Sequence, residues 1–151
     1  MEITPATIGD IPQLLPLLDM LFSQEDEFQP DHAAQRQGLE MIISSSGLGD
    51  ILVAKQAGSV VGMISLLYTV STALGAKVAL LEDMIVSPEV RGSGVGSSLL
   101  VQAQKHAELT GCKRITLLSE HDNAFAHRFY ERYGFKRSSM IPFRNVLVDD
   151  T

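Results

Sequence analysis

Three closely spaced glycines lie between a predicted strand and a predicted helix, where their backbone could bind an anion. Residues 83–100 read DMIVSPEVRGSGVGSSLL, and Arg91 precedes Gly92, Gly94 and Gly96. Glycine lets the main chain approach a ligand closely because it has no Cβ. The unpaired N–H groups and the positive dipole end of the following helix attract negative charge. The segment therefore predicts a cradle for a phosphate-bearing ligand.

The spacing of the glycines excludes two familiar phosphate-binding motifs. A dinucleotide fingerprint, G-x-G-x-x-G, beginning at Gly92 would need a glycine at position 97, where Ser97 stands. The Walker pattern, G-x-x-x-x-G-K-[ST], fails because no lysine follows Gly96. What remains is R-x-x-G-x-G, formed by Arg91, Gly94 and Gly96. A plain glycine-rich turn would explain these residues equally well without a second motif.

A second motif follows at residues 123–135, NAFAHRFYERYGF. It contains an asparagine, an alanine, an aromatic–tyrosine pair and a Gly-Phe pair, in that order. With both motifs in this order, the chain resembles the GNAT superfamily of acyl-CoA-dependent N-acetyltransferases over about residues 3 to 145. The resemblance implies acetyl-CoA as the acyl donor.

The resemblance assigns the glycine loop to the pyrophosphate of coenzyme A. The implied binding residues are Arg91, Gly92, Ser93, Gly94, Val95, Gly96 and Ser97. Ile85 and Val86 would lend backbone groups to the pantetheine amides, in the manner of an added strand. Asn123 would cap its helix and also hydrogen-bond the pantetheine arm, with capping alone as the alternative.

Acetyl transfer to an amine needs a group that takes a proton from the amine and a group that protonates the departing thiolate. By resemblance, Tyr130 directs its hydroxyl at the sulfur of coenzyme A and serves as the acid. The alternative is that Tyr130 only packs within its helix, the role that we assign to Phe129 and Tyr133.

Glu82 is the candidate base, because it places a charge within the apolar run 78–86. Strict alternation puts Glu82 and Met84 on one face of the strand and Asp83 on the other. In related sequences with Leu-Glu-Asp at this place, the first acid matches the base position and acts directly or through a water. Asp83 is the second choice, and solvation or pairing with an arginine is the alternative for both.

Composition indicates an ordinary globular protein. The 151 residues are 45% hydrophobic and 20% charged, which suits a single domain over residues 1–151. The net charge of −6, without a basic block, disfavours nucleic acid and anionic membranes as partners. We see neither a signal-peptide pattern nor an apolar stretch long enough to span a bilayer. Cys112 is the only cysteine, so we expect a cytoplasmic protein.

The sequence predicts no metal site. The four histidines, His32, His106, His121 and His127, show no ligand spacing, and a single cysteine cannot build a zinc site. We expect His106 and His127 on helix surfaces. The acids of residues 23–31, SQEDEFQPD, could attract an amine, although a solvated loop explains them equally well.

Hydrophobic periodicity and turn residues predict a mixed sheet flanked by helices. We expect strands at 2–6, 51–55, 60–69, 78–86 and 113–118, and one or two more within 135–148, broken at Pro142. We expect helices from Asp10, over 31–45, from the glycine loop to Leu109, and from Asn123 to Tyr133. The resemblance implies the GNAT fold, an α/β (α+β) arrangement of about six to seven strands and about four helices. In that fold the parallel strands 78–86 and 113–118 splay apart to admit the pantetheine arm.

These features predict an acetyl-CoA-dependent N-acetyltransferase. The single cysteine lies outside both motifs, which favours direct attack in a ternary complex over a covalent acyl-enzyme. We expect the acceptor to be a primary amine of a small molecule. The alternatives are acetylation of a protein N-terminus or lysine, and a non-catalytic module that senses acyl-CoA. Similar proteins often form homodimers, so the resemblance also allows a homodimer.

Overall fold

The computed structural model describes residues 1–23 and 29–148, and it divides into two compact units, Met1–Leu118 and Ser119–Thr151. The acids Glu25, Asp26 and Glu27, which we considered as attractors of an amine, lie outside the described residues. No helix within the described ranges is both long and apolar enough to cross a membrane.

The first unit contains a mixed sheet with the strand order β1-β2-β3-β4-β5. The strands are β1 (Glu2–Pro5), β2 (Gly49–Gln56), β3 (Ser59–Ser71), β4 (Ala76–Val86) and β5 (Ile115–Leu117). Neighbouring strands from β1 to β4 run antiparallel to one another, and β5 is parallel to β4. The mixed α/β fold is therefore confirmed, although the sheet has five strands within the described residues where we expected six to seven.

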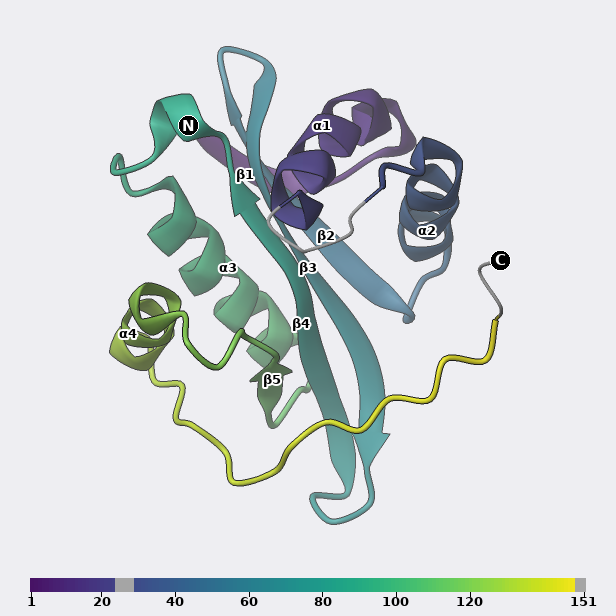
Figure 1. Ribbon diagram of the computed structural model, residues 1–151, viewed down its shortest axis with the longest axis vertical. Helices are drawn as coiled ribbons and strands as arrows, with labels where there is room; N and C mark the ends of the chain where they lie inside the picture. The colour runs from purple at the N-terminus through teal and green to yellow at the C-terminus, as the bar shows by residue number, and fades with distance from the viewer. Residues whose placement is uncertain (24–28, 149–151) are drawn as a thin grey trace. The chain divides into compact units, whose positions relative to one another are not determined.

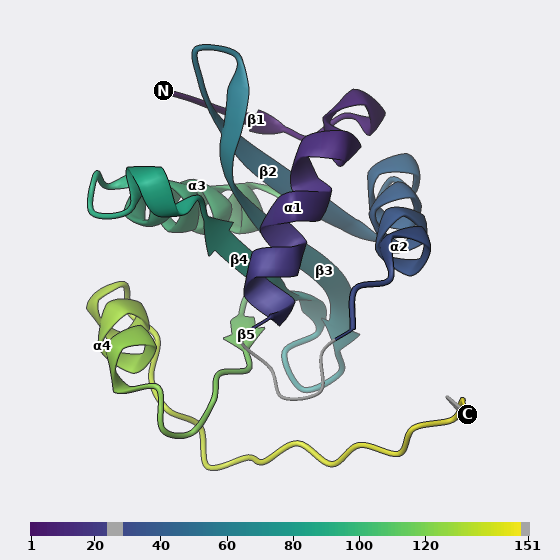
Figure 2. The ribbon, with the colours of Figure 1, turned by 45° about the horizontal axis from the view of Figure 1, so that its top comes forward.

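Helices cover both faces of this sheet (Figures 1 and 2). The helices α1 (Ile11–Phe22) and α2 (His32–Ser44) lie over one face, and α3 (Val95–Leu109) lies over the other. Two short 3-10 helices, η1 (Ile8–Asp10) and η2 (Pro88–Val90), precede α1 and follow β4. Packing of α3 is close, because a Cβ added to Gly62 of β3 would lie 3.0 Å from Leu99 Cδ1.

Residues at the ends of these elements explain where the elements begin and end. The Asp31 carboxylate accepts a hydrogen bond from Ala34 N at 3.0 Å and caps α2. Gly111 has a φ of +94° and ends α3 as expected, with Cys112 N donating to Ala107 O at 2.9 Å. The hairpin between β2 and β3 turns at 57–58, where both residues have positive φ.

A buried ion pair fixes the start of α1 against the sheet. Asp10 is 5% exposed, and its carboxylate accepts hydrogen bonds from the backbone N–H and the hydroxyl of Thr7. Its other oxygen lies 3.0 Å from Lys55 Nζ on β2. Burial by itself raises the pKa of Asp10, but the hydrogen bond from Thr7 and the Lys55 ammonium outweigh it, so the pKa lies below the ordinary value.

The second unit contains one helix and an extended segment. The helix is α4 (Ala124–Arg132), and Asn123 caps it by accepting a hydrogen bond from Ala126 N at 3.1 Å. Our expectation of one or two strands within 135–148 is wrong, because these residues form no strand. Pro142 has no N–H to give to a ladder, and Met140 N donates instead to the nearby Ser138 hydroxyl.

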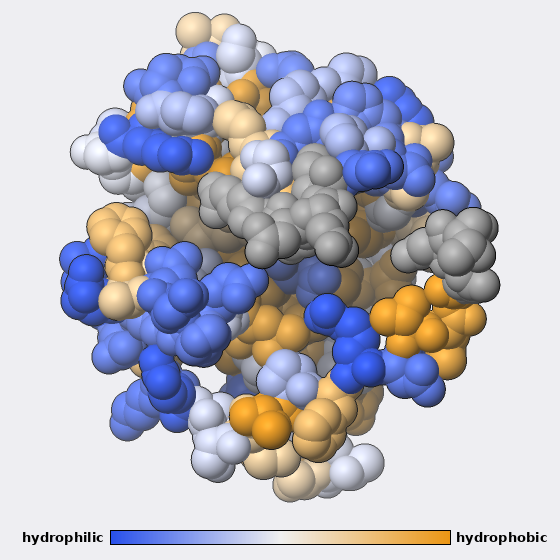
Figure 3. Space-filling view, in the orientation of Figure 1, coloured by the Kyte–Doolittle hydropathy of each residue, from blue (hydrophilic) through white to orange (hydrophobic). Residues whose placement is uncertain are grey.

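Apolar side chains are exposed along this extended segment. Met140, Phe143 and Leu147 have 82%, 93% and 88% of their surface exposed. Figure 3 shows orange, hydrophobic surfaces along the path that this segment takes in Figure 1. The apolar pattern that suggested strands therefore forms no part of the buried core.

We predict that Asp10→Asn lowers the free energy of unfolding by about 1–3 kcal/mol at neutral pH, because a buried charged hydrogen bond and ion pair are lost. A carboxyl group whose pKa is lower in the folded than in the unfolded state stabilises the fold at pH values above its unfolded-state pKa. This stabilisation is lost as the pH falls through the folded-state pKa. Denaturant unfolding from pH 7 down to pH 2 should therefore show the two proteins converging. Asp31→Asn is the matched control, since asparagine also caps helices. A gap that stays constant with pH would contradict this role of Asp10.

Candidate active site

The parallel ladder between β4 and β5 is short, which leaves one edge of β4 open. Pairing runs only from Ala79 with Ile115 to Leu81 with Leu117, while β4 continues to Val86. Residues 82–86 therefore have β3 on one side and no strand of the described residues on the other. The ladder ends because β5 itself ends at Leu117, so the predicted splay of two strands stays a prediction. An open strand edge can hydrogen-bond an extended ligand.

A β-bulge in β4 lies directly after the end of the β4–β5 ladder. Met84 pairs with Ile64 and Leu81 pairs with Leu66, so Glu82 and Asp83 together oppose the single residue 65. Paired residues share a face, and Ile64 and Leu66, two apart on β3, lie on one face. Leu81 and Met84 therefore share that face, although strict alternation would separate them. Our prediction that Glu82 and Met84 share a face is wrong here, because the bulge inserts one residue.

The glycine loop follows directly after β4 and leads into α3. Gly92 and Gly94 have φ values of +82° and +90°, which L side chains rarely adopt, and a Cβ on either would meet no atom within 4 Å. Ser93 donates its hydroxyl hydrogen to Val90 O. Arg91 Nε donates to the carbonyl of Val86 at 3.2 Å, which ties the loop to the end of β4. The glycines are thus required by backbone conformation, and the space in front of them is open.

The N-terminus of α3 is suited to an anion. Gly94 is the N-cap residue and offers no side chain, and in the described part of the chain no other side chain caps this end. The N–H groups of the first turn, at residues 95–97, therefore point outward with the positive end of the helix dipole. Val95 is 2% exposed and anchors this turn in the core. These features fit a phosphate group.

Close packing joins the cradle to the open edge of β4. Gly96 lies within the first turn of α3, and a Cβ there would lie 3.3 Å from Met84 Cε and 3.6 Å from Val86 Cγ2. Ile85 is buried, whereas Glu82 is exposed to solvent on the bulge. The first unit thus brings together all the predicted residues from Glu82 to Ser97.

The predicted acid, Tyr130, belongs to the second unit. Its ring packs against Phe129 and Phe135, with centroid distances of 5.3 Å and 5.7 Å. Burial raises the pKa of Tyr130 above its ordinary value. The phenol therefore keeps its proton at neutral pH, which an acid requires. Asn123, also in this unit, uses its side-chain oxygen as the helix cap.

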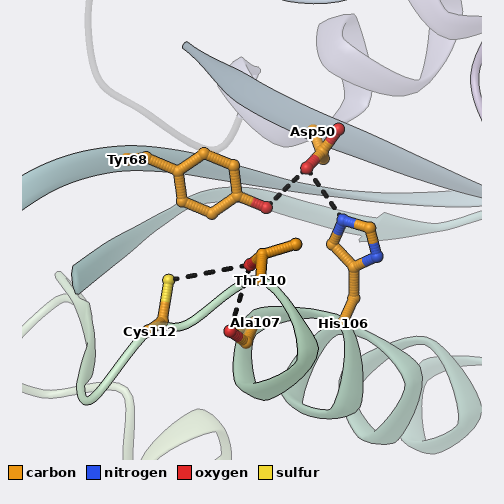
Figure 4. A network of polar contacts seen from close by, with 6 residues as sticks. All are labelled: Asp50, Tyr68, His106, Ala107, Thr110 and Cys112. Carbon is orange, nitrogen blue, oxygen red and sulfur yellow. Dashed lines mark hydrogen bonds and ion pairs between the residues drawn. The ribbon is translucent and has the colours of Figure 1, made fainter. Parts of the chain in front are cut away.

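A polar cluster that the sequence did not reveal lies near the other end of α3 (Figure 4). His106 was expected on the helix surface, but its Nε2 lies 2.8 Å from Asp50 Oδ2, and Tyr68 donates its hydroxyl hydrogen to the same oxygen at 2.5 Å. Burial and, after it, the Asp50 carboxylate raise the pKa of Tyr68. The cluster ties α3 to β2 and β3 and so fixes the axis of the helix whose other end forms the cradle.

The second unit also brings three consecutive residues, Glu120, His121 and Asp122, close enough for their ligand atoms to lie within 4.8 Å of one another. All three are exposed. Exposed acidic neighbours commonly lie this close without an ion, so we assign no metal role to them.

Comparison with known proteins agrees with this geometry. The family model described as Acetyltransferase (GNAT) family matches residues 14–135. The chain is 31% identical over 142 residues to the uncharacterized N-acetyltransferase YhfO of Bacillus subtilis, covering 92% of each chain. It is 30% identical over 137 residues to the aminoalkylphosphonate N-acetyltransferase of Salmonella typhimurium, covering 91% of this chain and 86% of that protein.

Solved structures share the fold. The crystal structure of a "possible acetyltransferase" from Clostridium difficile superposes with a TM-score of 0.88 over 98% of each chain, at 17% identity. The fold and the family match together place the chain among the acetyltransferases. The chain belongs to the GNAT family of acetyltransferases.

Proposed function

We propose that this protein transfers an acetyl group from acetyl-CoA to a primary amine of a small molecule, by direct attack in a ternary complex. The observation that carries the proposal is the open edge of β4 next to the uncapped N-terminus of α3. An extended amide-containing arm can hydrogen-bond the strand edge while a pyrophosphate binds the helix N-terminus.

In this proposal the residues from Arg91 to Ser97 hold the pyrophosphate of the cosubstrate. The backbone N–H groups of the loop and of the first helical turn donate to the phosphate oxygens, and the Arg91 side chain adds positive charge. Ile85 and Val86 supply the strand edge for the pantetheine arm, and Asn123 adds a hydrogen bond to the same arm. Acetyl-CoA, when bound, supplies the activated acyl group.

Glu82 and Tyr130 divide the proton transfers in the proposed reaction. Glu82 takes a proton from the acceptor ammonium, directly or through a water, because only the neutral amine is nucleophilic. Its exposure on the bulge keeps the carboxylate accessible to an acceptor from solvent. Tyr130 gives a proton to the departing thiolate, because its phenol is protonated at neutral pH and can act as the acid.

The family match extends across both compact units, which supports one acetyltransferase domain over residues 1–151. We place the enzyme in the cytoplasm, because a single cysteine forms no internal disulfide. A homodimer stays an expectation from similar proteins.

The acceptor is tested most directly with a panel of amines. One relative is named as an aminoalkylphosphonate N-acetyltransferase, so the panel should contain aminoalkylphosphonates beside polyamines, amino acids, aminoglycosides and lysine or N-terminal peptides. We expect release of free thiol from acetyl-CoA with at least one small amine. Turnover of peptides alone would indicate a protein acetyltransferase. Silence with every amine, with coenzyme A still bound, would indicate a sensor.

We predict that Gly94→Val weakens coenzyme A binding about tenfold or more, because the new side chain would occupy the open space in front of the helix N-terminus. Gly75→Val is the matched control. Gly75 also has a positive φ, +63°, and open space, but it lies in the turn between β3 and β4. Titration calorimetry should show the loss only for Gly94→Val. Equal affinities for the two variants would remove the cradle assignment.

We predict that Tyr130→Phe lowers kcat about 100-fold while the affinity for coenzyme A stays near that of the parent, because only the proton donor is lost. Tyr133→Phe removes a hydroxyl from the same helix end and should leave kcat nearly unchanged. Steady-state kinetics with the best amine, together with calorimetry of coenzyme A, separates the two effects. An undiminished kcat for Tyr130→Phe would show that another group protonates the thiolate.

A further inference from the structure

We propose that Ser65 is a positioning residue, whose hydroxyl holds the bulge of β4 and thereby sets Glu82 and Asp83 together on one face of the sheet. The inference rests on the proposed function of Glu82 and extends it to a residue outside both sequence motifs. Ser65 lies on β3 and has no contact with the glycine loop among the hydrogen bonds of the described residues.

The register of the sheet determines the face on which the acids lie. Leu81 and Met84 pair with Leu66 and Ile64, on the face that α3 covers. The residues between them oppose Ser65, which lies on the other face, beside Met63 of the core that α1 and α2 form. Without the extra residue, alternation would direct one of the two acids toward α3. The bulge therefore places two adjacent carboxylates on the side of α1 and α2.

Ser65 supplies the hydrogen bond that the bulge removes from the ladder. A bulge interrupts the regular pairing of backbone N–H and C=O groups. Here Asp83 N donates to Ser65 Oγ at 3.0 Å. A partly buried N–H without an acceptor would be costly, so this contact favours the bulged conformation over a regular ladder.

Ser65 lies in an apolar part of the core, where packing alone would favour an apolar side chain over a hydroxyl. Ser65 is 1% exposed, and its neighbours along β3, Met63, Ile64 and Leu66, are apolar and at most 1% exposed. A buried hydroxyl in such a place costs free energy unless it is hydrogen-bonded, and an apolar residue would fill the strand better. The bond to Asp83 N compensates for that cost.

Two carboxylates on one face define the kind of acceptor that the site attracts. They concentrate negative charge at the open edge of β4, which favours a cationic amine over a neutral one. Loss of the Ser65 hydroxyl should therefore disturb the acceptor and leave the cradle intact.

The test compares Ser65→Ala and Ser65→Cys, which lose the strong acceptor, with Ser65→Thr, which keeps a hydroxyl. We expect kcat/KM for the amine to fall roughly tenfold or more in the first two, with a displaced pH–rate profile, because the base is misplaced. The affinity for coenzyme A should stay within about twofold of the parent, and Ser65→Thr should recover most of the loss.

Hydrogen exchange of the Asp83 amide provides a second readout that needs no substrate. We expect faster exchange at Asp83 in Ser65→Ala and Ser65→Cys, with protection of the flanking strand residues unchanged. If the parent acetylates no amine, the proposed function fails, whereas the exchange data still decide whether Ser65 holds the bulge. Parental kinetics in a folded Ser65→Ala or Ser65→Cys, an equal loss of coenzyme A affinity, or unchanged Asp83 exchange would each overturn the proposal.

Discussion

The early end of the β4–β5 ladder is the constraint on which the rest of this structure depends. Parallel strands normally continue side by side, but here pairing stops at Leu81 and Leu117 while β4 runs on for five residues to Val86. Three of them, Met84 to Val86, keep antiparallel partners in β3, so this end of the strand remains paired along one edge although its other edge is open. The bulge at Glu82 and Asp83 coincides with this end and marks the change from a two-sided to a one-sided strand.

An open strand edge is useful only if the helix beside it is held in a fixed position. Gly62 and Gly96 allow the start of α3 to approach β3 and β4 closely, and a side chain at either place would require neighbouring groups to shift. Near the other end of the helix, the His106–Asp50 contact connects it to β2. The helix is therefore held near both of its ends, so the direction of its dipole does not depend on the glycine loop alone.

Local sequence signals predicted most of the helices and strands, but they did not predict contacts between residues far apart in the sequence. Asp31, Asn123 and Gly111 act at the helix ends where the sequence placed them, because a cap depends on residues at most a few positions away. The Asp50–His106 contact joins residues 56 positions apart, and no local pattern reports such a pair. The segment 135–148 misled us for the opposite reason, since an apolar sequence favours a strand only if backbone partners are available.

The same difference separates the donor side of the site from the acceptor side. The proposed donor cradle consists of main-chain groups, which require glycines at fixed spacing, so its motif is readable in the sequence. The proposed acceptor side consists of side chains whose direction depends on the register of β3 against β4, and one inserted residue reverses a prediction from alternation. Relatives can therefore retain the loop from Arg91 to Ser97 and still differ in acceptor. Ser65 illustrates the point, because it accepts a hydrogen bond from Asp83 N across the strands although it lies 18 residues before Asp83 in the sequence.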